Sequence, residues 1–193
     1  FTTAGLDDTT NPIENPEEVE TVEWTKLLGS LDGDAHWQGE TIVESNGSIY
    51  LTGVTTSDLD NEINQGGEGD AFISKFNADG DKQWTRLIGT PYVDSATDIE
   101  ISGDGYLFIL GYSFGDLAGH NNQGNKDIFI SKYDTDGVEI WTKSYGDPGE
   151  YWAHDFAIID DNSIYLTGAK NEDVFVDKLN IDGDIQWTKI LGS

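Results

Sequence analysis

Acidic side chains recur at matching places in a repeated sequence, and carboxylates placed in this way could bind a cation together. One set is expected where the first strand of each repeat begins, near a central axis, and a second set precedes each third strand. The first set is Glu40, Asp98 and Asp155, and the second is Asp70, Asp127 and Asp173. Ca²⁺ takes six to eight oxygen ligands, so Ca²⁺ is one candidate cofactor. The alternative, which we prefer, is that each carboxylate caps backbone N–H groups or bonds a neighbouring repeat.

One acidic stretch resembles a calcium loop more locally. Asp58, Asp60 and Glu62 stand at alternate positions. An EF-hand needs Gly for its sharp turn, and Ile63 occupies that place, so the motif fails.

Long loops on one rim of the predicted fold form a second group of candidates. Two of them share an Asp-Leu pair and an Asn-Gln-Gly segment, and the loops between repeats carry aromatic and histidine side chains. Aromatic rings offer flat apolar faces on which sugars can stack, so a glycan is a candidate ligand. Packing between repeats is the alternative for the two tryptophans. The candidate rim residues are His36, Trp37, Asp58, Asn64, Asp116, Asn122, Trp152 and His154.

Catalytic motifs are not evident. The three histidines lack a zinc-site spacing, and no Gly-x-Ser-x-Gly elbow supports a serine nucleophile. Paired acids could serve a glycoside-acting enzyme, but with 37 acidic residues such pairs arise easily. We therefore expect no enzyme activity and name no catalytic residue.

A Trp-Thr-Lys-like motif ending in Gly organises the chain. It begins at Trp24, Trp84, Trp141 and Trp187, at spacings of 60, 57 and 46 residues. Self-similarity at such a period is typical of repeat architectures.

Each repeat predicts four short strands, rich in β-branched and aromatic residues and divided by turn signals. Asp-Gly and Asn-Gly pairs in the tight turns supply the positive φ that short hairpins require. The predicted strands are 40–45, 48–55, 71–77 and 82–88, then 98–102, 106–113, 128–134 and 139–145, then 155–159, 163–168, 174–180 and 185–191.

Four antiparallel strands at this period describe a propeller blade. The segments Asp70-Ala71-Phe72-Ile73-Ser74-Lys75-Phe76, Trp-Thr-Lys-x-x-Gly and Ser48-Ile49-Tyr50-Leu51-Thr52-Gly53 resemble the bacterial β-propeller repeats of the SBBP family. The resemblance covers about residues 22–193. It implies a secreted or cell-surface location and no common activity.

The fold expected is therefore all-β: a β-propeller-like array of three four-stranded antiparallel blades plus one surplus N-terminal strand. Residues 1–20 are predicted to be an acidic linker or arm, and 21–193 a propeller domain with blades at about 40–89, 97–146 and 154–192. The surplus strand, 22–28, has no partners of its own and could be donated to a neighbour. Its predicted assembly residues are Val22, Trp24, Leu27 and Leu28.

Three blades do not close a ring, because closed propellers have typically four to eight. The chain could be part of a longer propeller, copies could associate, or the fold could be an unusual small one. The expected partner is thus the chain itself, as an oligomer or filament, or further repeats.

The net charge of the chain argues against one further class of partner. A formal net charge of −27 argues against nucleic acid, whose phosphates need a basic surface. No apolar run is long enough for membrane insertion, and cysteine is absent. The function expected is a non-catalytic extracellular structural or adhesive module that could self-assemble by strand donation or by association of blade edges. A ligand-binding propeller for calcium or a glycan is the first alternative, and an enzyme is the second.

Overall fold

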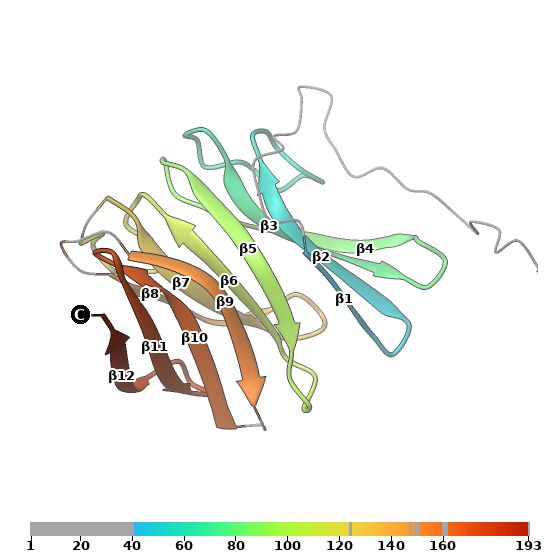
Figure 1. The fold of residues 1–193 in the computed structure, drawn as a ribbon. Helices are drawn as coiled ribbons and strands as arrows, with labels where there is room; N and C mark the ends of the chain where they lie inside the picture. The colour runs from blue at the N-terminus through green and yellow to red at the C-terminus, as the bar shows by residue number, and fades with distance from the viewer. Residues whose placement is uncertain (1–40, 124, 147, 149–150, 160–161, 193) are drawn as a thin grey trace, which may run out of the picture.

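The computed structural model describes residues 41–192, with the exception of 124, 147, 149–150 and 160–161. All twelve predicted strands are present (Figure 1). They are β1 (Thr41–Ser45), β2 (Ser48–Thr55), β3 (Asp70–Asn77), β4 (Lys82–Ile88), β5 (Asp94–Ile101), β6 (Leu107–Ser113), β7 (Asp127–Tyr133), β8 (Glu139–Tyr145), β9 (Tyr151–Ile159), β10 (Ser163–Lys170), β11 (Asp173–Asn180) and β12 (Ile185–Leu191). The predictions for residues 1–40, including the surplus strand, fall outside the described residues.

The strands form three four-stranded antiparallel sheets, each with its strands in chain order. The all-β prediction with three such sheets is therefore confirmed. Figure 1 shows the sheet β5–β8 between the other two. Within the part of the chain that the structure describes, the array is open and no sheet closes on itself. The same part contains no helix long and apolar enough to cross a membrane.

Two strands start earlier than the sequence predicted. β5 begins at Asp94 and β9 at Tyr151, where loops were expected. The reason is irregular pairing. The register of β5 against β6 shifts between Ala96 and Asp98, and the register of β9 against β10 shifts at the Thr167–Gly168 step. With these shifts, the strand pairing continues on the N-terminal side of Asp98 and Asp155. Asp98 and Asp155 therefore lie inside strands rather than at their starts.

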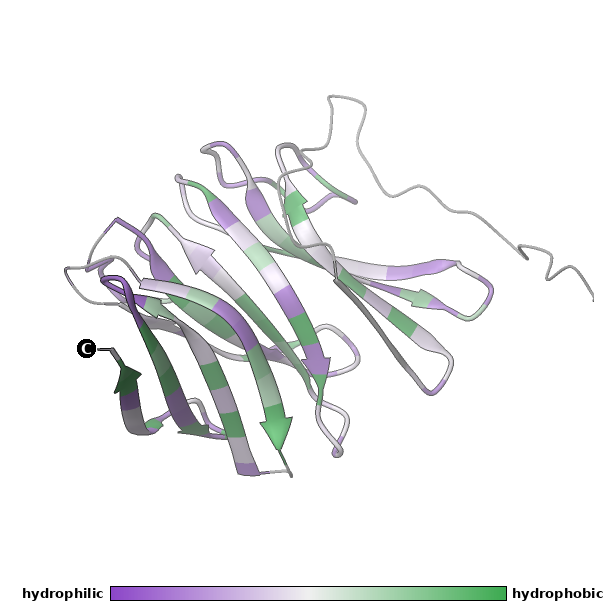
Figure 2. Ribbon diagram, viewed as in Figure 1, coloured by the Kyte–Doolittle hydropathy of each residue, from purple (hydrophilic) through white to green (hydrophobic). Residues whose placement is uncertain are grey.

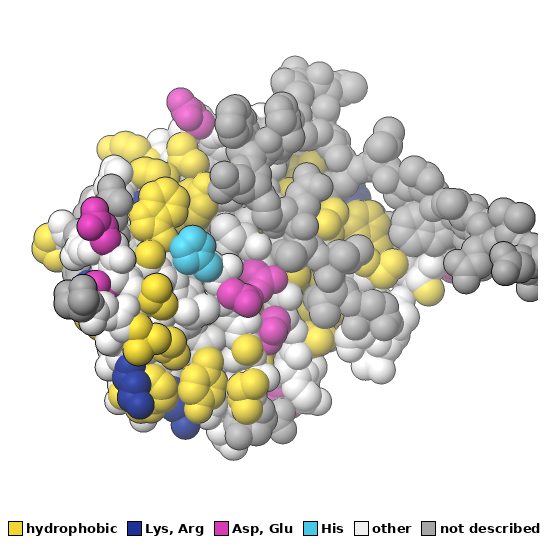
Figure 3. Space-filling view, viewed as in Figure 1, with side chains coloured by type: hydrophobic (Ala, Val, Ile, Leu, Met, Phe, Trp, Pro, Cys, Tyr) yellow, Lys and Arg dark blue, Asp and Glu magenta, His cyan; other side chains and the backbone are white. Residues whose placement is uncertain are grey.

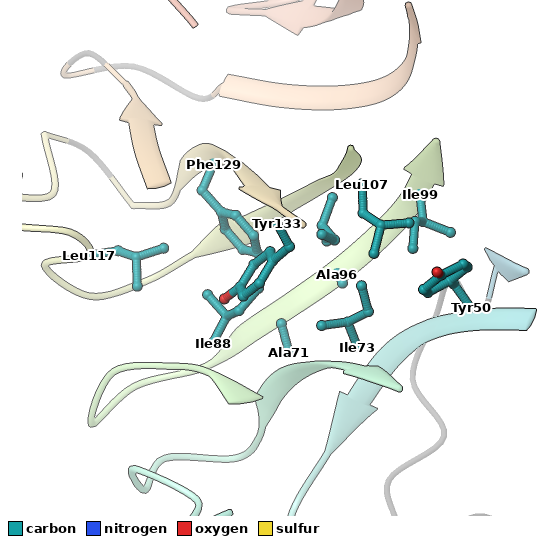
Figure 4. Close-up of a cluster of buried hydrophobic side chains, with 11 residues drawn as sticks. Tyr50, Ala71, Ile73, Ile88, Ala96, Ile99, Leu107, Leu117, Phe129 and Tyr133 are labelled. Carbon is teal, nitrogen blue, oxygen red and sulfur yellow. The ribbon is translucent and has the colours of Figure 1, made fainter. Parts of the chain in front are cut away.

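Apolar side chains alternate along the strands and form two clusters, one on each face of the middle sheet (Figure 2). In the first cluster, Tyr50 and Ile73 of the first sheet meet Leu107 and Phe129 of the second (Figure 4). Because the middle sheet is covered on both faces, β7 is buried along its whole length, whereas β12 is exposed along its whole length.

The turns between the third and fourth strands share one conformation. Gly80, Gly137 and Gly183 have φ of 73°, 77° and 80°. In each turn this glycine donates its N–H to the carbonyl three residues earlier, at 2.9 to 3.1 Å. The Asp-Gly signal is thus confirmed as a turn whose φ favours glycine.

Candidate functional site

The aspartates that begin the third strands pack against the glycines that end the Trp-Thr-Lys motifs. A Cβ on Gly89 would lie 2.2 Å from Asp70 Cγ, and one on Gly146 would lie 1.9 Å from an Asp127 carboxylate oxygen. Asp173 has the same relation to Gly192. Each motif glycine therefore leaves room for the carboxylate of its own sheet.

Two of these carboxylates also cap loops. Asp70 Oδ2 accepts the backbone N–H of Gln65 at 2.6 Å, and Asp127 Oδ2 accepts that of Gln123 at 3.1 Å. Burial, partly offset by the Gln65 hydrogen bond, raises the pKa of Asp70 to about 6, with a further contribution from the nearby charge of Asp94. This geometry favours the capping interpretation over a shared cation site.

Asp94 is a second fully buried carboxylate at the junction of the first two sheets. Its Oδ2 accepts the N–H of Thr90 at 2.6 Å and the Thr90 hydroxyl at 2.8 Å. Burial raises its pKa. Sequence reasoning missed Asp94 because it fell in a predicted loop, and only the register of β5 places it inside.

Asp98 and Asp155, from neighbouring first strands, do come together. Asp98 on β5 lies within hydrogen-bonding reach of Asp155 on β9. Burial and then the charges of Asp155 and Glu100 raise the pKa of Asp98 to about 6, against the hydrogen bond from the Ile99 N–H. Figure 3 shows acidic side chains beside a histidine on the face turned toward the viewer.

In the described part of the first sheet, no carboxylate stands at the position that corresponds to this acidic pair. The position of the first sheet that corresponds to Asp98 and Asp155 is occupied by Thr41. Thr41 pairs with Thr52, Asp98 pairs with Leu110, and Asp155 pairs with Thr167. Glu40 lies outside the described residues. Glu100 accepts the N–H of Ile158 at 2.7 Å instead. Among the residues that the structure describes, no three His, Cys, Asp or Glu side chains are arranged to hold a metal ion.

The candidate rim residues of the two long loops form hydrogen bonds within their own loops. Asp58 Oδ1 accepts the N–H of Asn64 at 2.9 Å, and Asp116 Oδ1 accepts that of Asn122 at 2.8 Å. The two asparagine side chains donate to the carbonyls of Thr55 and Ser113, at 3.0 and 3.1 Å. The shared sequence of these loops is therefore explained by a shared internal hydrogen-bond pattern.

The remaining rim candidates are placed differently from the prediction. Trp152 and His154 lie on strand β9 and not on a loop. Both are exposed, and the ammonium of Lys126 lies over the ring of Trp152. The predictions for His36 and Trp37 fall outside the described part of the chain.

Contacts between consecutive sheets repeat, and they involve the tryptophans of the Trp-Thr-Lys motifs. Trp84 of the first sheet packs on Gly137 in the turn of the second, and its Nε1–H donates to Thr135 O at 3.3 Å. Arg86 Nε and Lys75 Nζ donate to the same turn, at Gly137 O and Thr135 O, both at 2.9 Å.

The second sheet contacts the turn of the third through the same motif positions, although the indole N–H of Trp141, unlike that of Trp84, has no hydrogen-bond partner among the described residues. The ring of Trp141 packs on Gly183, and the Tyr145 hydroxyl donates to Gly183 O at 2.7 Å. Lys143 forms an ion pair with Asp184 at 2.5 Å. The last strand of one sheet thus holds the Asp-Gly turn of the next. The signal for this contact was the recurrence of Trp-Thr-Lys together with Asp-Gly.

Comparisons with known proteins identify a short local similarity. No family model matches the chain. A curated relative, the Regulatory protein FlaEY of Caulobacter vibrioides, is 32% identical over 84 residues. The match covers 40% of this chain and 9% of that protein.

Proposed function

We propose that this chain is a non-catalytic structural or adhesive module on the outside of a bacterial cell, built from propeller blades of the SBBP type. The observation that carries the proposal is the sheet-to-sheet contact that recurs, with the same motif and the same turn, at both junctions. A contact that propagates from one repeat to the next is a device for building an array.

Propeller geometry is supported by the connectivity within and between the sheets. Each sheet is an up-and-down set of four strands, and the first strands of the second and third sheets, β5 and β9, pack against the sheet before them. Propellers repeat such sheets radially around a channel. An array of this kind offers rims and faces for contact without requiring a reactive centre.

Surface location is supported by composition. A net charge of −27 gives high solubility and repels anionic surfaces. The SBBP resemblance points in the same direction.

Labelling of intact cells tests the proposal. An antibody raised against the full chain should label intact cells of the organism that makes it, and external protease should remove the label. Deleting the gene should weaken attachment or cohesion of the cells. Recovery of the protein only after cell lysis, or a purely metabolic defect in the deletion strain, would contradict the proposal.

A second candidate function, cation or glycan binding, is favoured by the Asp98–Asp155 pair and the exposed Trp152 on β9. The charge of Asp155 beside Asp98 helps to raise the pKa of Asp98, and a cation bound between the two carboxylates would relieve their repulsion. Ca²⁺ should then raise Tm in the wild type and not in Asp98→Asn. An equal Tm with and without Ca²⁺ would remove the cation part, and unchanged glycan-array binding by Trp152→Ala would remove the sugar part.

A further inference from the structure

The outward side of the third sheet repeats positions that are covered in the first sheet, and in the described part of the chain no further sheet follows it (Figure 1). We call the side of β9–β12 that is turned away from the second sheet the open face; Val174, Trp187 and Leu191 lie on it. Val174 is 47% exposed and Leu191 is 62% exposed. Their counterparts in the first sheet, Ala71 and Ile88, are 0% and 5% exposed, because the second sheet covers them. A contiguous exposed apolar face of this kind is typical of a surface for protein–protein contact.

The outer side of the first sheet, at the other end of the array, is already buried. Phe72, Ser74 and Thr85 alternate along β3 and β4 with the residues that face the second sheet, so they point away from it. Their exposed fractions are only 6%, 0% and 3%. The open face of a second copy therefore cannot dock there. A contact that uses the open face on both copies instead has two-fold symmetry.

Charges of opposite sign stand at the two ends of one cross-strand row on the open face. The row runs from β9 to β12 through Asp155, Thr167, Val176 and Lys189, each paired with the next. Asp155 and Lys189 are both exposed. A two-fold axis parallel to the strands lays β9 of one copy over β12 of the other and keeps each row at its own level. Asp155 of each copy then faces Lys189 of the other, so the row is complementary to itself in charge.

The neighbouring row is complementary to itself in size. It runs through Ala157, Tyr165, Lys178 and Trp187. The same axis lays Trp187 of one copy over Ala157 of the other, so the largest side chain of the row meets the smallest. A hollow of about 140 Å³ lies on the open face and is lined by Ala157 and Tyr165, among others. The indole of Trp187 is held edge-on to the Tyr165 ring of its own sheet, with 6.1 Å between centroids, and is 38% exposed. It can therefore fill the hollow of a second copy.

We propose that two copies of this chain pair through their open faces, about a two-fold axis parallel to the strands of the third sheet. Trp187 of each copy fills the hollow of the other, and Lys189 of each copy pairs with Asp155 of the other. Two sheets packed face to face keep their strand directions within about 30° of each other, so rows at the same level can meet. The inference names the partner of the proposed structural module and rests on that proposal.

Sedimentation velocity on the full chain tests the pairing, at protein concentrations from about 1 to 300 μM and in about 0.3 M NaCl, where long-range repulsion between acidic copies is screened. We expect a monomer–dimer equilibrium, with the dimer at twice the 21.2 kDa of one chain. Trp187→Ala should weaken association at least ~10-fold, as truncation of a central interface tryptophan does.

Charge reversal tests whether Asp155 faces Lys189. Lys189→Glu alone should weaken association at least ~10-fold, because two acidic side chains then face each other at both ends of the row. Asp155→Lys alone should weaken it in the same way, with two basic side chains facing each other. An equimolar mixture of the two variants should associate about as tightly as the wild type, because every acidic side chain then faces a basic one. Recovery in the mixture also shows that both variants are folded.

Two neighbouring residues on β12 supply a matched control. Leu191 lies on the open face, whereas Ile190, which is 53% exposed, pairs with the buried Phe175 on the opposite face. Leu191→Glu should weaken association and Ile190→Glu should leave it unchanged, although both add the same charge to the same strand. Equal weakening by the two variants would indicate pairing through the edge of β12 and would overturn the face-to-face contact.

A wild type that stays monomeric across this range overturns the pairing proposal. So does a mixture of the two charge variants that does not recover association. Either result would leave the surface location and the attachment phenotype standing, because those are measured on cells. Loss of surface labelling would contradict the proposed function while leaving the dimer intact.

Discussion

At the scale of single residues, the aspartates that begin the third strands have a structural role within their own sheets. Asp70 is buried, caps Gln65 N–H and sits on Gly89, and the same Asp–Gly contact recurs in the other two sheets. A carboxylate that repeats with the motif is thus explained by packing. The positions of Asp94 and of the Asp98–Asp155 pair do not follow from the repeat alone, because each depends on how two neighbouring sheets pack together.

The Asp–Gly contact predicts a steric coupling. Gly89→Ala should destabilise the fold by about 2–3 kcal/mol, since the new Cβ has no room beside the Asp70 carboxylate. Removing that carboxylate should relieve the clash, so Asp70→Ala with Gly89→Ala should cost less than the two single changes added together. Urea unfolding of the four proteins measures this. Additive costs would show that the contact is not the reason for the glycine.

Buried carboxylates predict a pH dependence. The pKa of Asp70 is about 6 in the folded state against 3.8 ordinarily, so the folded state binds the proton more tightly. Its contribution is fully present below pH 3.8 and is lost as pH rises through 6. Asp98 acts in the same direction. Asp70→Asn should therefore raise Tm at pH 7.5, and raise it less at pH 5.

The control for this prediction is Asp79→Asn, which removes an exposed carboxylate of the turn at residues 77–81. Thermal unfolding monitored by circular dichroism should show little change in Tm for Asp79→Asn at either pH. An Asp70→Asn protein with a lower Tm at pH 7.5 would mean that the hydrogen bond from Gln65 outweighs the burial of the charge.

At the scale of elements, the burial of the last strand of a sheet depends on whether another sheet follows it. The last strand of a sheet is half-buried where another sheet follows and fully exposed where none does, as β4, β8 and β12 show. Because the motif residues are nearly the same in all three, this difference comes from neighbours and not from strand propensity.

Two equivalent tryptophans measure the contribution of the junction. Trp84 and Trp187 each lie 6.1 Å from a tyrosine ring of their own sheet, but in the described structure only Trp84 has a following sheet to pack on. Trp84→Ala should cost about 2 kcal/mol more than Trp187→Ala in urea unfolding at low protein concentration. Equal costs would show that the junction adds nothing to the contact within the sheet.

At the scale of the whole molecule, charge opposes compaction. A net charge of −27 on 193 residues remains after every Lys and Arg is counted, so the ion pairs Lys82–Asp60, Arg86–Glu62 and Lys143–Asp184 do not reduce it. Self-repulsion of this kind destabilises a compact state and is screened by salt.

Salt should therefore stabilise the protein. Raising NaCl from about 0.02 to 0.3 M should increase Tm by a few degrees, since the Debye length falls to less than about 10 Å. Calorimetry in NaCl and in choline chloride separates screening from specific cation binding, because both salts screen equally. A Tm that falls with salt would show that local ion pairs outweigh the net repulsion.

The sequence by itself determined the strands, the three sheets and the Asp-Gly turns. These depend on alternation, β-branched residues and positive φ, which are local properties that repeat along the chain. The tertiary structure decided which equivalent residues are covered. Strand registers with shifts at Thr97 and Gly168 brought Asp94 inside and Asp98 beside Asp155, and the stacking of sheets left Trp187 exposed where Trp84 is held. Such pairings join residues far apart in the chain, so no local pattern could specify them.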